Sequence, residues 1–66
     1  MSILIIELAG GHHRRFDGED ADRIGPALLD WYAAADLRDV YELNLPGGSV
    51  LHIVKANVVS IQYDPS

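Results

Sequence analysis

Residues 40–53 read VYELNLPGGSVLHI, and this stretch decides the fold that the sequence predicts. Its first half alternates apolar and polar residues, which is typical of a half-buried strand. A three-residue loop at the central Pro-Gly-Gly would place Leu43 opposite Leu51 and Glu42 opposite His52. Both pairs are chemically matched in that register. We therefore expect an antiparallel hairpin with one apolar face.

The chain after this hairpin predicts one more strand. Residues 55–57 (Lys-Ala-Asn) form the expected turn, in which Asn57 would supply a positive φ. In residues 58–63, Val59, Ile61 and Tyr63 would face the core, and the polar residues between them would face outward.

The N-terminal part predicts a second hairpin. Residues 3–8 read ILIIEL and residues 12–16 read HHRRF, with two glycines between them. A two-residue Gly-Gly loop would set Glu7 opposite Arg14 and Ile5 opposite Phe16, whereas a three-residue loop would shift the register.

An amphipathic helix is predicted between the hairpins, beginning at Asp20 or Asp22 as the cap and ending near Asp36. Its buried stripe would consist of Ile24, Leu28, Trp31 and Ala35. Pro26 is tolerated in a first turn, although residues 25–26 (Gly-Pro) would also suit a break between a short leading turn and the main helix. The fold class is thus α+β, a single domain over residues 1–66 in the order β-β-α-β-β-β, with one helix on one face of an antiparallel sheet.

Composition restricts the function. The 66 residues include ten Asp and Glu, five Lys and Arg, three His and no Cys, for a formal net charge of −5. The missing Cys excludes disulfides and thiolate chemistry, and we expect a cytoplasmic protein. The negative charge opposes binding to nucleic acid or an anionic membrane. The apolar start lacks a basic region and is interrupted by Glu7, so it predicts neither a signal peptide nor a membrane span. Frequent Ala, Asp and Arg favour a bacterial or phage genome.

The first strand predicts an interaction surface. Ile3 and Ile5 point away from Leu4 and Ile6, so the strand is apolar on both faces, whereas one helix covers only one face. Val50, Val54 and Val58 would extend the second apolar face. We therefore expect a protein-protein interaction module that forms a homo-oligomer, or docks on a larger protein, through this face or an edge strand. Tyr32, which lies off the helix stripe, is a further contact candidate, and closure into a small barrel is the alternative that would bury both faces.

A basic cluster supplies the alternative function. His12, His13, Arg14 and Arg15 beside a glycine turn suggest an anion- or nucleic-acid-binding site. On a strand, however, the cluster divides into His12 with Arg14 on one face and His13 with Arg15 on the other. Adjacent histidines therefore diverge, and we expect no metal and no cofactor.

The sequence predicts no catalytic site. Glu42 opposite His52, with Ser49 or Ser60 nearby in sequence, is the nearest approach to an acid-base arrangement. No nucleophile elbow, phosphate-binding loop or zinc motif accompanies these residues. A non-enzymatic protein is the prediction.

Overall fold

The computed structural model describes residues 1–66 and confirms the predicted α+β fold, with its element order β-β-α-β-β-β. The five strands and one α-helix are β1 (Ile3–Leu8), β2 (His13–Asp17), α1 (Gly18–Ala34), β3 (Val40–Asn44), β4 (Val50–Val54) and β5 (Val58–Asp64). Two short 3-10 helices, η1 (Pro46–Gly48) and η2 (Lys55–Asn57), occupy the predicted turns of the second half.

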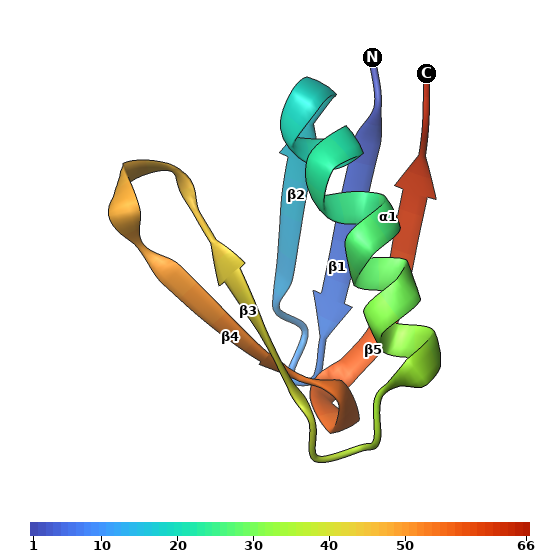
Figure 1. Ribbon diagram of the computed structural model, residues 1–66, viewed down its shortest axis with the longest axis vertical. Helices are drawn as coiled ribbons and strands as arrows, with labels where there is room; N and C mark the ends of the chain where they lie inside the picture. The colour runs from blue at the N-terminus through green and yellow to red at the C-terminus, as the bar shows by residue number, and fades with distance from the viewer.

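The strands form two antiparallel sheets rather than one. A three-stranded sheet has the order β2-β1-β5, and β3 pairs only with β4. Figure 1 shows α1 running diagonally across one face of the three-stranded sheet, while the β3-β4 hairpin projects to the side of β2. The helix therefore leaves the start of β2 uncovered. The two chain ends lie side by side at the far end of the sheet.

One hydrophobic core joins the helix and both sheets. Its eight buried residues are Leu4, Ile6, Phe16, Ala21, Ile24, Leu28, Leu43 and Ile53. The hairpin contributes Leu43 and Ile53, each only 2% exposed. The predicted stripe residue Trp31 packs against this core, and its ring centroid lies 5.3 Å from that of Tyr41. The hairpin is thus held to the rest of the domain by side-chain packing.

The first hairpin uses the three-residue loop. Leu4 pairs with Phe16 and Ile6 with Arg14, so the register predicted from a two-residue loop is wrong by one residue. Gly10 and Gly11 both have a positive φ, near +85° and +82°, which suits glycine. A one-residue slip exchanges the faces of a strand. The observed register brings Phe16 to the side of the helix, where it is buried.

The second hairpin has the predicted register, with Leu43 opposite Leu51 and Glu42 opposite His52. Two details of the following segment differ from the prediction. Asn57 does not have a positive φ, because the turn is a 3-10 helix. A β-bulge opposite Glu7 and Leu8 shifts β5, so that Val58 packs against the core and Val59 is 63% exposed. The predicted roles of these two valines are therefore exchanged.

The helix begins earlier than predicted and is continuous through Pro26. Its N-cap is Asp17, and the first helical N–H, from Gly18, donates to the Ser2 carbonyl at 2.8 Å. The last turn has no basic residue of its own. A cation is favoured at a helix C-terminus, and Lys55 of η2 supplies it. Its Nζ donates to the Ala35 carbonyl at 2.6 Å.

Helix α1 approaches the sheet closely at Gly25. A Cβ at this position would lie 2.6 Å from Cδ1 of the Tyr63 ring on β5. Such a contact requires the ring to move, and rotation about the Cβ–Cγ bond would not relieve it, because Cγ itself would lie only 2.9 Å away. Gly25 is therefore a packing requirement.

We predict that Gly25→Ala destabilises the fold by about 1–3 kcal/mol, the usual cost of overpacking. In an unobstructed helix the same change would stabilise by about 1 kcal/mol. Urea unfolding followed by circular dichroism measures the change in the free energy of unfolding. In a Tyr63→Ala background the ring is absent, and Gly25→Ala should then increase the stability. An increase in stability in the otherwise wild-type chain would contradict the packing argument.

Candidate functional site

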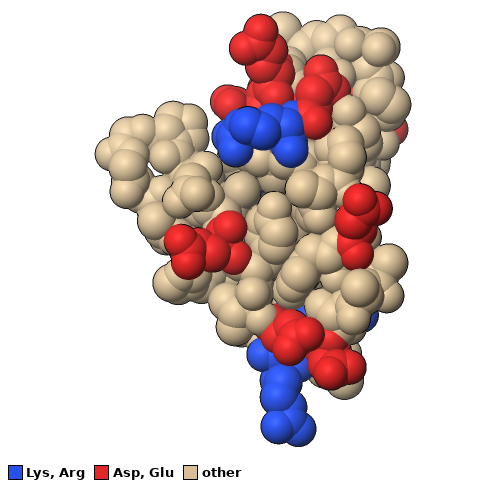
Figure 2. All heavy atoms as spheres, viewed as in Figure 1, with Lys and Arg blue, Asp and Glu red and all other residues tan.

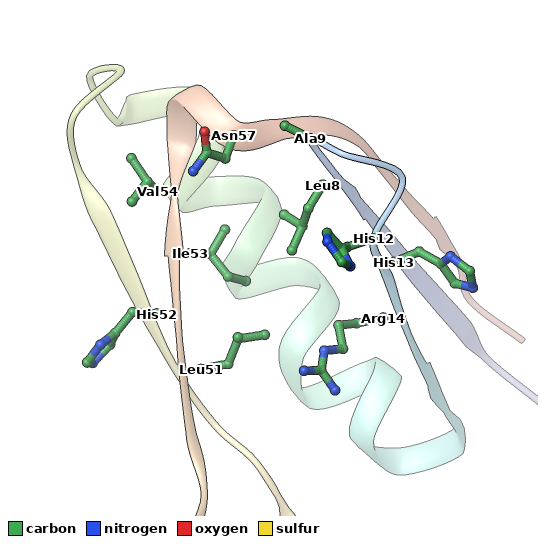
Figure 3. Close-up of a pocket in the computed structure, with 10 residues that line it drawn as sticks. All are labelled: Leu8, Ala9, His12, His13, Arg14, Leu51, His52, Ile53, Val54 and Asn57. Atoms are coloured by element: carbon green, nitrogen blue, oxygen red, sulfur yellow. The ribbon is translucent and has the colours of Figure 1, made fainter.

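A groove lies between β2 and β4, and we call it the β2–β4 groove. Its volume is about 410 Å³, within the range of small-molecule sites. The lining residues are Leu8, Ala9, His12, His13, Arg14, Leu51, His52, Ile53, Val54 and Asn57. They come from the first hairpin on one side and from β4 and η2 on the other (Figure 3).

The course of the helix creates this groove. Because α1 crosses the sheet diagonally, it does not reach the start of β2, and the hairpin covers that end only in part (Figure 1). Leu8, Leu51 and Ile53 therefore form an apolar floor. A main-chain hydrogen bond closes one end of the groove, where the Ala9 N–H donates to the Asn57 carbonyl at 2.8 Å.

Both strands along the groove have an unpaired edge. In the first hairpin, Leu8 N–H donates to the His12 carbonyl at 2.7 Å, and hydrogen-bonded pairs alternate along an antiparallel ladder. The main-chain groups of His13 and Arg15 consequently point away from β1. In the second hairpin, the bond from Leu45 N–H to the Ser49 carbonyl, 2.8 Å, gives the same alternation. The main-chain groups of Val50, His52 and Val54 therefore point away from β3.

The groove differs in charge from the rest of this acidic chain. None of its lining residues is Asp or Glu, whereas Arg14 and His12 point into it (Figure 3). Arg14 makes no ion pair and no side-chain hydrogen bond. Arg15 and Arg23 instead pair with Asp17 and Asp20, and Figure 2 shows basic and acidic side chains close together on one face. Arg38 also makes no ion pair, but it does not line the groove. Arg14 is therefore a free cation next to an apolar floor.

The predicted basic cluster divides between two faces, as its strand position implied. His13 points away from His12 and Arg14 (Figure 3). Arg15 pairs with Ile5 on the outer face, where its Nε lies 3.0 Å from Asp17 Oδ1. Three of the four residues thus line the groove, but only His12 and Arg14 point into it.

The predicted apolar surface is not continuous. Ile3 and Ile5 lie on the outer face of the three-stranded sheet, whereas Val50 and Val54 belong to the separate hairpin and Val58 packs on the core. The half-buried Ile3 and Ile5 lie between two polar rows formed by neighbouring strands. Internal pairs hold these rows in place, Arg15 with Asp17 at 3.0 Å and Gln62 with Asp64 at 2.7 Å. The stems of such long side chains cover apolar surface.

Tyr32 is less available for a partner than its position off the stripe suggested. It is 37% exposed, and Lys55 Nζ lies 4.6 Å from its ring centroid. The nearest approach to an acid-base pair is also solvent-exposed, since His52 Nε2 lies 3.7 Å from Glu42 Oε2 with both side chains 64% exposed. No three His, Asp or Glu side chains come together in a way that could hold a metal ion.

A polar cluster at the other end of the sheet ties α1 to β5. The Tyr63 hydroxyl donates to Asp22 Oδ1 at 2.6 Å. Hydrogen bonds from the Ser2 and Tyr63 hydroxyls lower the pKa of Asp22, and the bond to Asp22 raises the pKa of Tyr63. The Ser66 N–H donates to Ser2 Oγ at 3.0 Å and joins the chain ends to this cluster. These groups are used in structural bonds and leave no unpaired buried polar atom.

Comparisons with protein-family models, with curated proteins and with solved structures give no match for this chain. The helix α1 lacks the length and apolar character needed to cross a membrane.

We predict that the Tyr63–Asp22 bond stabilises the fold mainly between about pH 4 and pH 10, around the ordinary pKa values of 3.8 and 10.0. The lowered pKa of Asp22 means that folding favours its carboxylate form, so the stability from this group is lost as the pH falls through the folded-state pKa. The raised pKa of Tyr63 means that folding favours its phenol form, so the stability from that group is lost as the pH rises through the folded-state pKa. The difference in melting temperature between wild type and Tyr63→Phe should therefore be largest between about pH 4 and pH 10 and should become smaller below and above that range.

The matched control is Tyr41→Phe, because the Tyr41 hydroxyl makes no hydrogen bond in the structure. Its effect on the melting temperature should not show the two-ended narrowing. A Tyr63→Phe difference that stays constant from pH 3 to pH 11 would contradict the role given to this bond.

Proposed function

We propose that the chain is a small non-enzymatic interaction module that binds an extended segment of a partner protein in the β2–β4 groove. The observation that carries this proposal is the pair of unpaired strand edges beside one apolar floor. Strand addition uses such edges, since main-chain hydrogen bonds give affinity and pockets for alternate side chains give specificity.

The directions of the strands suit an inserted segment. Figure 1 shows β2 and β4 running in opposite senses. A segment between them would pair in parallel with one strand and antiparallel with the other, and it would join the two sheets into one mixed sheet. Such an addition would also protect edges that are otherwise open to non-specific pairing.

Two features favour a different chain over a second copy of this one as the occupant. The formal net charge of −5 slows the encounter of two copies of this chain. On the outer face, the polar rows on either side of Ile3 and Ile5 leave little exposed apolar area for sheet-on-sheet packing. Self-association through that face is the less supported form of the interaction hypothesis.

We predict that His52→Pro weakens segment binding at least about tenfold while the domain remains folded. The His52 N–H points from β4 toward the groove, so proline removes an edge donor without removing a bond to β3. The probe is a displayed library of random peptides, selected on the immobilised wild-type protein. Affinities of the selected peptides are then measured on both proteins.

Glu42→Pro is the matched control. Glu42 lies opposite His52 in the register, is equally exposed, and directs its N–H to the other edge of the hairpin. Both variants lose the contact between Glu42 and His52, so only the blocked edge differs. Equal binding by the two variants, at equal melting temperatures, would refute binding at the β4 edge, and failure to enrich any peptide on the wild type would refute the proposed function.

A further inference from the structure

We infer that the segment bound in the β2–β4 groove carries an acidic side chain two residues from an apolar one, both directed toward the floor. This inference rests on the proposed function and adds the chemistry of the occupant. It is drawn from the placement of one arginine and three apolar side chains in the groove.

Arg14 is the group that would select the acidic side chain. It lies on the same face of β2 as Phe16 and opposite Ile6, yet its guanidinium points into the groove and has no carboxylate partner (Figure 3). Of the other three arginines, Arg15 is paired with Asp17 and Arg23 with Asp20, while Arg38 is unpaired but does not line the groove. A guanidinium binds a carboxylate through two parallel hydrogen bonds.

His12 reinforces this selection. It lies two residues before Arg14 on the same face and points into the same space (Figure 3). Its ring can donate a hydrogen bond to a carboxylate oxygen in either protonation state, since one nitrogen carries a proton even in the neutral form. No lining residue is acidic, so no carboxylate in the groove competes for these donors.

The spacing follows from strand geometry. Arg14 lies at the end of the groove near Leu51, whereas Leu8 and Ile53 lie nearer Asn57 (Figure 3). In an added strand, alternate side chains face the floor and recur about every 6.6–6.8 Å. Leu51 and Ile53 are two residues apart on β4. An acidic residue beside Arg14, at the level of Leu51, and an apolar residue over Leu8 and Ile53 are thus two positions apart along the bound segment.

The test compares peptides selected from the displayed library on wild-type protein, on Arg14→Gln and on Arg15→Gln. Wild type should enrich peptides with an acidic residue two positions from an apolar one. For a selected peptide, replacing that Glu by Gln should weaken binding about two- to fivefold, the range expected for a partly exposed ion pair. On Arg14→Gln this difference should disappear.

Arg15→Gln is the control for charge alone. Arg15 lies on the same strand as Arg14, and its substitution removes the same charge but from the outer face. It should retain the full preference for Glu. Selected peptides without an excess of Asp and Glu, or an equal loss of preference in the two variants, would overturn the inference while leaving strand docking intact. If no peptide is enriched on the wild type, the proposed function itself fails.

A nucleic acid is the competing occupant for a cationic groove, and a labelled single-stranded oligonucleotide distinguishes it. We expect no binding at physiological salt, because one arginine in a chain of net charge −5 cannot neutralise several phosphates. Oligonucleotide binding that falls steeply with salt and is lost in Arg14→Gln would overturn the peptide assignment.

Discussion

The burial of Leu4 and Ile6 on the central strand is the constraint on which the rest of the structure depends. Both side chains are fully buried, and they share one core with the helix and with Leu43 and Ile53 of the hairpin. A chain of this length buries only about 60% of the surface exposed by its unfolded form, so a single core must serve every element. The helix and the hairpin consequently divide one face of a three-stranded sheet between them.

That division explains why the domain has a groove at all. If β4 paired with β2, the two sheets would join into one and leave no groove between these strands. Gly25 against Tyr63 holds the helix close to β5, and Lys55 holds the helix end close to η2. The start of β2 is left without a cover as a result. The edge amides, the apolar floor and the free guanidinium of Arg14 are all products of the same arrangement.

Local pattern predicted the elements well, because alternation and turn composition act within a few residues. The second hairpin shows this, since its Pro-Gly-Gly turn and matched cross-strand pairs specify one register. The first hairpin was ambiguous, because the Gly-Gly pair fits two loop lengths and the choice depends on which face must bury Phe16. The bulge that exchanges Val58 and Val59 is likewise a long-range effect between β1 and β5.

The groove could be predicted only in part, for a related reason. The sequence identifies His12 and Arg14 as a same-face pair, but Leu51 and Ile53 read simply as core residues of a hairpin. Knowing that they adjoin His12 and Arg14 requires knowing that β4 passes β2 without pairing with it. No pattern within either hairpin contains that information, since it depends on the path of the helix between them.

Net charge and local charge lead to different conclusions about the partner, and distance decides between them. Charges farther apart than about 8–10 Å are largely screened at physiological salt, so dispersed surface acids act mainly on the approach of a partner. A carboxylate within about 4 Å of Arg14 gains roughly 1–4 kcal/mol of Coulomb energy before desolvation, depending on the local dielectric. The acidic surface therefore slows encounter with an acidic segment, while the groove determines which residue of that segment is held. An overall charge of −5 is thus compatible with a site that prefers a carboxylate.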